Sequence, residues 1–448
     1  MSSLTRSLAA FAAALDLAVP RDVIARAGDA FVDSLGVALG GSADPAARIA
    51  RASIDLATGS GTSTIWSSGE RARPQDAAFV NSVQMHVLDF DDSSLSLRGH
   101  PSSTMMPTAI AVAQSTGASG TQALSAYAIG LEVATRVARW LTPLHYLKGW
   151  HTTVTAGVFG TVAIAGRLLG LDETAMRHAF GLAASQASGM TRNFGSMAKA
   201  FQTGHAARSG IVAARLAAAG MNADLDILDG SQGFLALYGG AEIPPDRALL
   251  QDLGQRWELL NPGLYMKRWA CCYAVHRPVV GLLELQAQEG FVANDIRSIA
   301  VGFLPGAAHP LNHTNPQSGL EGKFSIEYAM AAALLDGDLS LESFTDEAVQ
   351  RPAAQALQRK VSRFEIPHEG VFNGLTGFND LIVDTTRGQF KYQIDRTPGS
   401  PQWPLTPDEL EKKFISCART QLNPEAAHAL YRRARALPDL HTVESLFD

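Results

Sequence analysis

The strongest constraint on the fold is a succession of alanine- and glycine-rich helical segments in the first half of the chain. Residues 119–141 start with polar side chains and continue with apolar ones at helical spacing. Residues 153–170 end at a glycine, Asp172 is a suitable N-cap for the next helix, and residues 199–220 also end at a glycine. Because alanine-rich helices approach each other closely, this pattern predicts a compact helical bundle.

The character of the sequence changes near Pro262. Residues 295–304 alternate and contain β-branched side chains, which favours a strand, and residues 381–395 are typical of two strands joined by a tight Arg-Gly turn. Between them, residues 324–337 have a helical pattern that ends at a glycine. We therefore expect a smaller α+β domain over residues 266–396.

The remaining segments define the predicted domain organisation. Residues 398–407 form a proline-rich connector, after which a helical pattern returns. We expect residues 1–265 to form the first part of the helical domain and residues 397–448 to rejoin it, with the α+β domain inserted between them. The predicted fold class is mainly α with an α+β part.

Composition excludes several functional classes. The chain has 448 residues, 46% hydrophobic and 18% charged, so it can bury sizeable cores. Its formal net charge of -6 argues against a nucleic-acid-binding protein. No apolar run reaches membrane-spanning length, and the first segment, which contains Asp16, resembles an amphipathic helix more than a signal peptide. Three cysteines are too few for a zinc ribbon or an iron–sulfur cluster, and we expect a cytoplasmic protein.

One short polar run, residues 86–101, is unusually rich in groups that move protons. It contains His86, Asp89, Asp91, Asp92 and His100. These side chains offer oxygen and nitrogen ligands for a divalent metal, but their spacing matches no known ligand signature. The alternatives are an acid/base site and a structural loop whose aspartates bond to the backbone.

Two further basic groups stand in helical regions. His151 precedes a helix, where the helix dipole lowers the pKa of an imidazole and an anionic ligand is favoured. Lys199 lies in a weakly charged, small-residue stretch, where an enclosed lysine would hold an anion or act as a base. Ser196 and Lys199 match an SxxK pattern, but the accompanying elements of penicillin-recognising enzymes are missing. Each residue also has an ordinary structural interpretation.

A third group lies at the seam between the two predicted domains. Lys267, Cys271, Cys272 and His276 fall within ten residues of each other. No GxGxxG loop, Walker loop or nucleophile elbow occurs, so the sequence indicates no nucleotide cofactor. Cations and imidazoles beside one acidic cluster suit the binding of a small polyanion and the transfer of protons on it.

Taken in order, these motifs resemble those of the MmgE/PrpD family. The resemblance runs from about Asn81 to Phe414 and rests on DFDD followed by HP, GWHTT, GSMAKAFQTGHAARSG, ILDGSQGFLALYGG, KxxxCCxxxH, EGKFSIEYAMAAALLDG and DRTPGSPQWPLTPDELEKKF. Each motif alone is modestly specific, whereas the ordered set is highly specific.

The resemblance implies an architecture and a class of chemistry. It implies a large helical-bundle domain built from both ends of the chain, a smaller α+β lid domain, and a homodimer. It also implies no metal and no organic cofactor. The family's enzymes dehydrate, decarboxylate or epimerise small di- or tricarboxylates, so we expect a small polycarboxylate substrate and neither a nucleic-acid nor a membrane partner.

The resemblance also assigns positions. Those that match the family's active site are Asp89, His100, His151, Lys199 and Lys267. Ser93 stands where decarboxylase-like members have threonine, and Cys272 stands where they have histidine. The segment between Ser93 and His100 is also one residue longer than in those members.

We predict His100 as the catalytic base or acid, with Asp89 setting its tautomer, and we expect Lys199, Lys267 and His151 to supply positive charge. Ser93 and His276 are further candidates for substrate binding.

Epimerisation needs a second proton-transfer group, for which Cys272 and Tyr146 are candidates. The leading prediction is therefore cofactor-independent epimerisation of an iminodisuccinate-like substrate. The alternatives are a 2-methylcitrate-type dehydratase, a metal-dependent hydrolase that uses the Asp/His run, and a non-catalytic relative.

Overall fold

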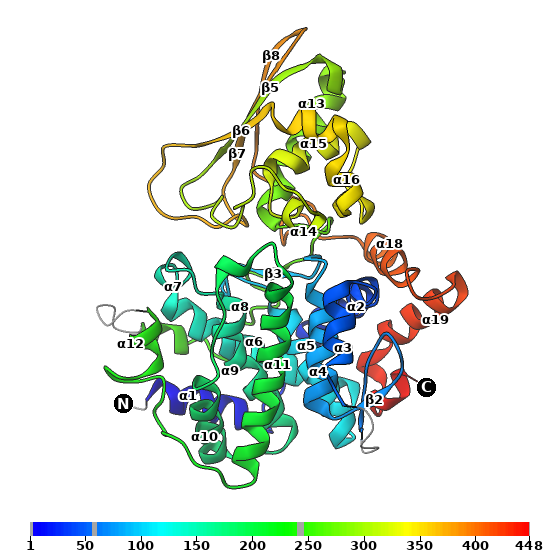
Figure 1. Ribbon diagram of the computed structural model, residues 1–448. Helices are drawn as coiled ribbons and strands as arrows, with labels where there is room; N and C mark the ends of the chain where they lie inside the picture. The colour runs from blue at the N-terminus through cyan, green and yellow to red at the C-terminus, as the bar shows by residue number, and fades with distance from the viewer. Residues whose placement is uncertain (1–2, 56–60, 240–245, 448) are drawn as a thin grey trace. The chain divides into compact units, whose positions relative to one another are not determined.

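The computed structural model describes residues 3–55, 61–239 and 246–447. The chain divides into two compact units (Figure 1). The helical unit consists of Met1–Thr191, Lys199–Leu264 and Thr406–Asp448. The mixed unit consists of Arg192–Ala198 and Tyr265–Leu405.

Helices from both ends of the chain build the helical unit. Those of the first half are α1 (Leu4–Ala13), α2 (Arg21–Gly41), α3 (Pro45–Ala52), α4 (Pro74–His86), α5 (Pro101–Thr116), α6 (Gly120–Leu141), α7 (Leu144–Leu147), α8 (Thr152–Thr155), α9 (Gly157–Leu168), α10 (Glu173–Ala184), α11 (Met197–Ala218) and α12 (Phe234–Gly239). The C-terminal pair is α18 (Pro407–Ala418) and α19 (Pro424–Arg435). The short strands are β1 (Ser63–Thr64), β2 (Arg71–Ala72), β3 (Ser93–Ser94) and β4 (Leu264–Tyr265). Of the described helices, none combines the length and apolarity needed to cross a membrane.

Close helix packing explains the many small residues of this unit. Helices α5, α6 and α9 form its centre, and a Cβ atom at Gly130 of α6 would lie 2.7 Å from the carbonyl oxygen of Gly160 in α9. The C-terminal helix α18 packs on α2, where a Cβ atom at Gly36 would meet the ring of Phe414 at 2.9 Å. A larger residue at either glycine would push two helices apart.

The mixed unit contains a four-stranded sheet with helices to one side of it (Figure 1). Its strands are β5 (Ile296–Phe303), β6 (Val361–Glu365), β7 (Asn379–Thr385) and β8 (Gly388–Ile394), in the order β6-β5-β7-β8. Strands β5 and β6 are parallel, and the other pairs are antiparallel. The helices are α13 (Tyr273–Glu289), α14 (Gly319–Gly322), α15 (Ile326–Asp336), α16 (Asp346–Gln350) and α17 (Pro352–Gln358).

The predicted fold class, mainly α with an α+β part, is confirmed. One helix prediction is wrong in a way that bears on function. The segment predicted as one helix over residues 153–170 breaks at Ala156 into α8 and α9. The hydroxyl of Thr155 donates to the carbonyl oxygen of His151 at 3.3 Å, and such side-chain bonds to the backbone compete with continuous helix. The break leaves His151 at the start of a separate short turn.

Candidate active site

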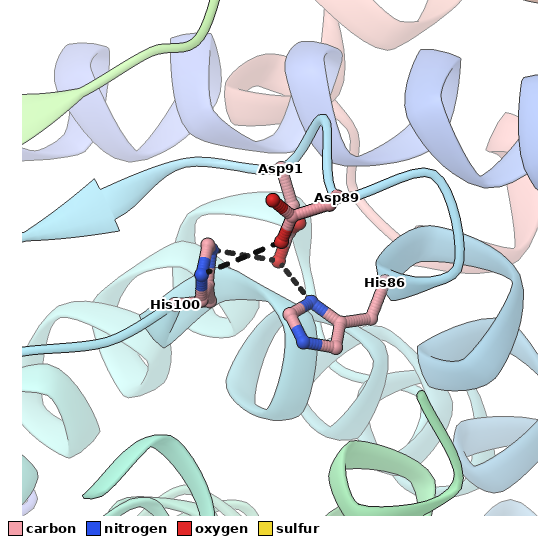
Figure 2. Close-up of side chains that lie close together, drawn as sticks. All are labelled: His86, Asp89, Asp91 and His100. Atoms are coloured by element: carbon pink, nitrogen blue, oxygen red, sulfur yellow. Dashed lines mark hydrogen bonds and ion pairs between the residues drawn. The ribbon is translucent and has the colours of Figure 1, made fainter. Parts of the chain in front are cut away.

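Four side chains of the polar run, residues 86–101, converge inside the helical unit (Figure 2). His86 ends α4, Asp89 and Asp91 follow in the next turn, and His100 immediately precedes α5. One ligand-type atom from each lies within 4.8 Å of the others. All but His100 are buried. The run is therefore a compact site and not a solvated loop.

The hydrogen bonds of His100 fix its tautomer. Its Nδ1 lies 2.9 Å from the carbonyl oxygen of Asp92, which can only accept, so Nδ1 carries the proton. Its Nε2 then carries the lone pair and lies 3.7 Å from Oδ1 of Asp89. The prediction that Asp89 sets this tautomer is wrong, because the main chain of Asp92 holds the opposite side of the ring.

Asp91 has a larger part in the site than the sequence suggested. Its Oδ2 lies 2.8 Å from Nδ1 of His86 and 3.5 Å from Nδ1 of His100 (Figure 2). Burial is the main cause that lowers the pKa of His86, so this imidazole is neutral at neutral pH and donates to the carboxylate. The alternative of a structural loop, in which the aspartates only bond to the backbone, therefore does not describe Asp91.

The side chain of Asp92 belongs to a second buried network. Its carboxylate accepts hydrogen bonds from the backbone N–H of Ser102, at 3.2 Å, and from the Ser102 hydroxyl. That hydroxyl also lies 2.6 Å from the Tyr127 hydroxyl. Burial raises the pKa of Asp92 to about 7, partly offset by the bonds from Ser102. The Asp92 carboxyl thus helps to position Ser102, two residues after His100.

Lys199 of α11 forms an ion pair with Asp89, and both side chains are buried. The predicted enclosed lysine therefore has a carboxylate partner 110 positions earlier in the chain. Asp89 adopts φ 53°, a left-handed conformation that costs free energy in a residue other than glycine. Among the described residues, Arg98 at φ 50° is the other such non-glycine position, so the two bracket the turn that leads to His100.

His151 is buried beside this cluster and is neutral. Its Nδ1 lies 2.7 Å from Oε1 of Gln202, an acceptor whose orientation is fixed by a bond from Nε2 of Gln202 to the Met190 carbonyl. Burial first, and then the charge of Lys199, lower the pKa of His151 well below 6.5. The expectation that His151 supplies positive charge is therefore wrong at neutral pH, although its low pKa agrees with the predicted direction.

A glycine contact sets the distance between the two segments that carry His100 and His151. The backbone N–H of His100 donates to Oγ1 of Thr153 at 3.1 Å. A Cβ atom at the preceding residue, Gly99, would lie 2.3 Å from that oxygen and 3.0 Å from the Thr153 nitrogen. Only a residue without a side chain allows this approach.

Two other predicted residues belong to the helical unit. Ser93 is buried in β3, and Tyr146 is half-buried in α7. His86 was predicted only as one of the ligands in the metal-site alternative, and Gln202 and Arg98 were not predicted as site residues. The spacing of Gln202, three positions after Lys199 on one helix, was a signal for it. Arg98 is half-buried, its pKa is lowered by burial, and it lies in the segment predicted to be one residue longer.

The mixed unit holds the remaining predicted residues. Lys267 is fully buried, and Cys272 is the N-cap residue of α13. His276 lies in the first turn of α13 and is fully buried, with its ring stacked on Tyr273 at 4.8 Å and tilted against Trp269 at 5.2 Å. This packing gives His276 a structural role within the unit, and its predicted contact with substrate stays a prediction.

The side chains in Figure 2 also offer the donors that divalent cations bind. One feature favours proton transfer over metal binding. The ammonium group of Lys199 already neutralises Asp89, and a metal that used this carboxylate would have to displace the lysine. The bond from Nδ1 of His100 to a carbonyl oxygen is compatible with either role for Nε2.

Buried imidazoles, carboxylates and one lysine within a mainly helical fold define a class of proteins equipped for acid/base chemistry. The chain belongs to the MmgE/PrpD family: the model of the MmgE/PrpD N-terminal domain matches residues 6–245, and that of the C-terminal domain matches residues 269–437. The predicted family resemblance is thereby confirmed.

Several curated proteins are similar over nearly the whole chain. A cis-aconitate decarboxylase of Homo sapiens is 28% identical over 439 residues, covering 95% of this chain and 89% of the relative. Its counterpart in Mus musculus is 28% identical, with coverages of 95% and 88%. A cis-aconitate decarboxylase of Aspergillus terreus is 28% identical, with coverages of 77% and 74%.

Proposed function

We propose that this protein is an enzyme that transfers protons at the carbon next to a carboxylate of a small di- or tricarboxylic acid, without a metal or organic cofactor. The observation that carries the proposal is the tautomer of His100. Its Nδ1 proton is held by the Asp92 carbonyl, which leaves Nε2 as a base beside the Asp89–Lys199 pair. Membership of the MmgE/PrpD family supports the same class of chemistry.

The proposed step follows from the acidity of the substrate. A proton next to a carboxylate is very weakly acidic, so its removal needs a positioned base and a cation that stabilises the charge developing on the carboxylate oxygens. Nε2 of His100 takes the proton, and the C–H electron pair moves into the carboxylate. Asp91, 3.5 Å from Nδ1, stabilises the imidazolium that results, and Lys199, which is paired with Asp89, supplies the cation.

Within this class we propose epimerisation of an iminodisuccinate-like substrate. The planar intermediate must then receive a proton on its opposite face, which requires a second group. Cys272 and Tyr146 remain the candidates for that group, and Cys272 occupies a helix N-cap, where backbone N–H groups favour an anionic side chain.

A lyase reaction is the second candidate, and the relatives favour it. The similar proteins from Homo sapiens and Mus musculus, which cover 95% of this chain, are named for the decarboxylation of cis-aconitate. Decarboxylation and dehydration also place negative charge on a carbon next to a carboxylate, so the same base and cation would serve. They differ from epimerisation in releasing carbon dioxide or water.

Incubation of the enzyme with iminodisuccinate, 2-methylcitrate and cis-aconitate in D2O separates these reactions. We expect proton NMR to show deuterium entering the stereocentre of iminodisuccinate, with the second diastereomer appearing and no alkene absorbance. Alkene absorbance from 2-methylcitrate, or formation of itaconate from cis-aconitate, would show that the enzyme is a lyase and not an epimerase. No exchange or turnover of any of the three acids would contradict the proposal.

A chelator series tests the metal-dependent hydrolase that uses the same side chains. We expect proton exchange to be unchanged after dialysis against EDTA. Loss of activity, followed by recovery with one divalent ion, would overturn the cofactor-free mechanism.

We also propose that the protein is a homodimer, as the family resemblance implies. Light scattering after gel filtration should give twice the mass of the chain, and a monomeric mass would contradict this.

A further inference from the structure

One carboxylate oxygen links two imidazoles in the site, and only one of them has a part in the proposed reaction. Oδ2 of Asp91 lies 2.8 Å from Nδ1 of His86 and 3.5 Å from Nδ1 of His100 (Figure 2). We infer that His86 is a positioning residue for the proton transfer: it donates its Nδ1 proton to Asp91 and keeps that carboxylate ionised and facing His100. This inference rests on the proposed function of His100 as the base.

The surroundings of Asp91 require such a donor. The carboxylate has no exposed surface, and a buried carboxylate loses the hydration that stabilises its charge. A hydrogen bond to the ionised form compensates for that loss and favours the charge. His86 gives this bond at 2.8 Å, and the same oxygen then faces the ring that becomes positive during the reaction.

The groups around His86 keep its proton on the side of Asp91. The charged or titratable side chains that face it are Asp89, Asp91, Lys199, His100 and His151. Burial is the largest influence on its pKa and Lys199 acts in the same direction, so the ring stays neutral despite the two carboxylates. Nε2 of His86 makes no hydrogen bond with a described residue, and Nδ1 is therefore its single ordered polar contact.

The side chain of His86 does not cap helix α4. Helix α4 ends at His86, and the last turn is closed by a backbone bond from the Val87 N–H to the Val83 carbonyl. The imidazole is thus neither a cap nor a surface group. The residue is 1% exposed, and its ring points into the cluster drawn in Figure 2. This supports a role that acts through Asp91.

Two substitutions separate positioning from packing. The side-chain amide of His86→Asn can place an N–H near the former Nδ1, whereas His86→Leu fills the space without a donor. His178→Leu is the matched control, because among the described residues His178 bonds to the main chain of Ala223 alone, at 2.8 and 3.1 Å. The readout is the rate of deuterium incorporation into iminodisuccinate, or into whichever of the three acids the wild-type enzyme uses, together with circular dichroism and the melting temperature.

We expect kcat of His86→Leu to fall by about 10- to 100-fold, the effect of losing one hydrogen bond to a buried charge, with KM changed by less than about threefold. Without the donor, Asp91 takes up a proton at higher pH, so the acidic limb of the kcat profile should move to higher pH. His86→Asn should recover kcat to within about fivefold and restore the wild-type profile. His178→Leu should behave as wild type.

The failure of this inference differs from the failure of the proposed function. If the wild-type enzyme exchanges none of the acids, the proposed function is wrong and His86 has no reaction to support. If it does exchange them while folded His86→Leu keeps kcat within threefold, the inference is wrong. Equal losses in the leucine and asparagine variants, without a change of the pH profile, would show that the imidazole acts by packing alone.

Discussion

The buried carboxyl of Asp92 offers a direct test of how burial changes the pKa of a group next to the site. Its pKa is raised from an ordinary 3.8 to about 7, mainly by burial and to a lesser extent by Asp33 and Asp91, against the opposing effect of the bonds from Ser102. The folded protein therefore keeps a proton that the unfolded chain has already released between these two values. In that interval the free energy of unfolding falls as pH rises, because the unfolded state binds fewer protons than the folded state.

The size of the effect follows from the two pKa values. Each pH unit between them contributes about 1.4 kcal/mol, so the full loss of stability above pH 7 is about 4 kcal/mol. Asp92→Asn imitates the protonated acid, since its amide is neutral and combines an NH2 donor group with an acceptor oxygen. We therefore expect the stability of Asp92→Asn relative to wild type to rise by about 2.5 kcal/mol from pH 5 to pH 8.

Urea unfolding followed by circular dichroism at both pH values measures this difference. Asp16→Asn, which changes an exposed aspartate, is the matched control and should show no comparable change between the two conditions. A relative stability of Asp92→Asn that stays constant within about 0.5 kcal/mol would refute the reasoning. It would mean that the Ser102 bonds outweigh burial and that Asp92 is ionised in the folded protein.

Three further predictions concern buried groups of the helical unit. Lys199→Met leaves Asp89 as a buried charge without its ammonium partner and should lower the free energy of unfolding by about 3 to 5 kcal/mol, whereas the double variant with Asp89→Asn should recover much of it in urea titrations. Burial lowers the pKa of His145 to about 4, so its ring signal in NMR should not titrate above pH 5, and the stability it confers should be lost as pH falls from about 6.5 towards 4. Burial raises the pKa of Glu132 to about 7, so Glu132→Gln should gain stability relative to wild type in urea titrations as pH rises from 5 to 8. No gain would mean that Arg136 keeps the carboxylate ionised.

Much of the fold could be predicted because its signals are local. The side chain of Ser119 accepts from the backbone N–H of Gln122 and caps α6, which begins at Gly120, one residue after the predicted start. Asp172 accepts from the Ala175 N–H at 2.8 Å and begins α10 as expected. Gly337 ends α15 at φ 79°, a conformation that favours glycine. Caps of this kind involve residues within one turn, so they are legible in the sequence.

Other parts of the fold depend on distant partners. Strand β6 (Val361–Glu365) lies parallel to β5, and its sequence gave no sufficient signal because it is short and mostly polar on one side. Its pairing is fixed only when β5 and the intervening helices are in place. The break of the predicted helix at Ala156 likewise depends on bonds to His151 that its helical spacing does not reveal.

The candidate site divides in the same way. The run from His86 to His100 is local, so its acid/base character could be inferred from composition. The tautomer of His100 depends on a main-chain carbonyl, which has no signature in the identity of Asp92. The pairing of Asp89 with Lys199 joins residues 110 positions apart, so which aspartate meets the lysine could not be decided from spacing.

The contact of Gly99 with Thr153 has a consequence for how this enzyme could be altered by evolution or by design. The Gly99 backbone lies so close to Thr153 that a Cβ atom has no room, so the separation of the His100 and His151 segments cannot be tuned gradually by substituting larger residues at position 99. Position 153 offers a finer control, because Ser keeps the oxygen that accepts from His100 and removes one methyl group. Libraries that seek a new reaction should therefore hold position 99 constant and vary position 153.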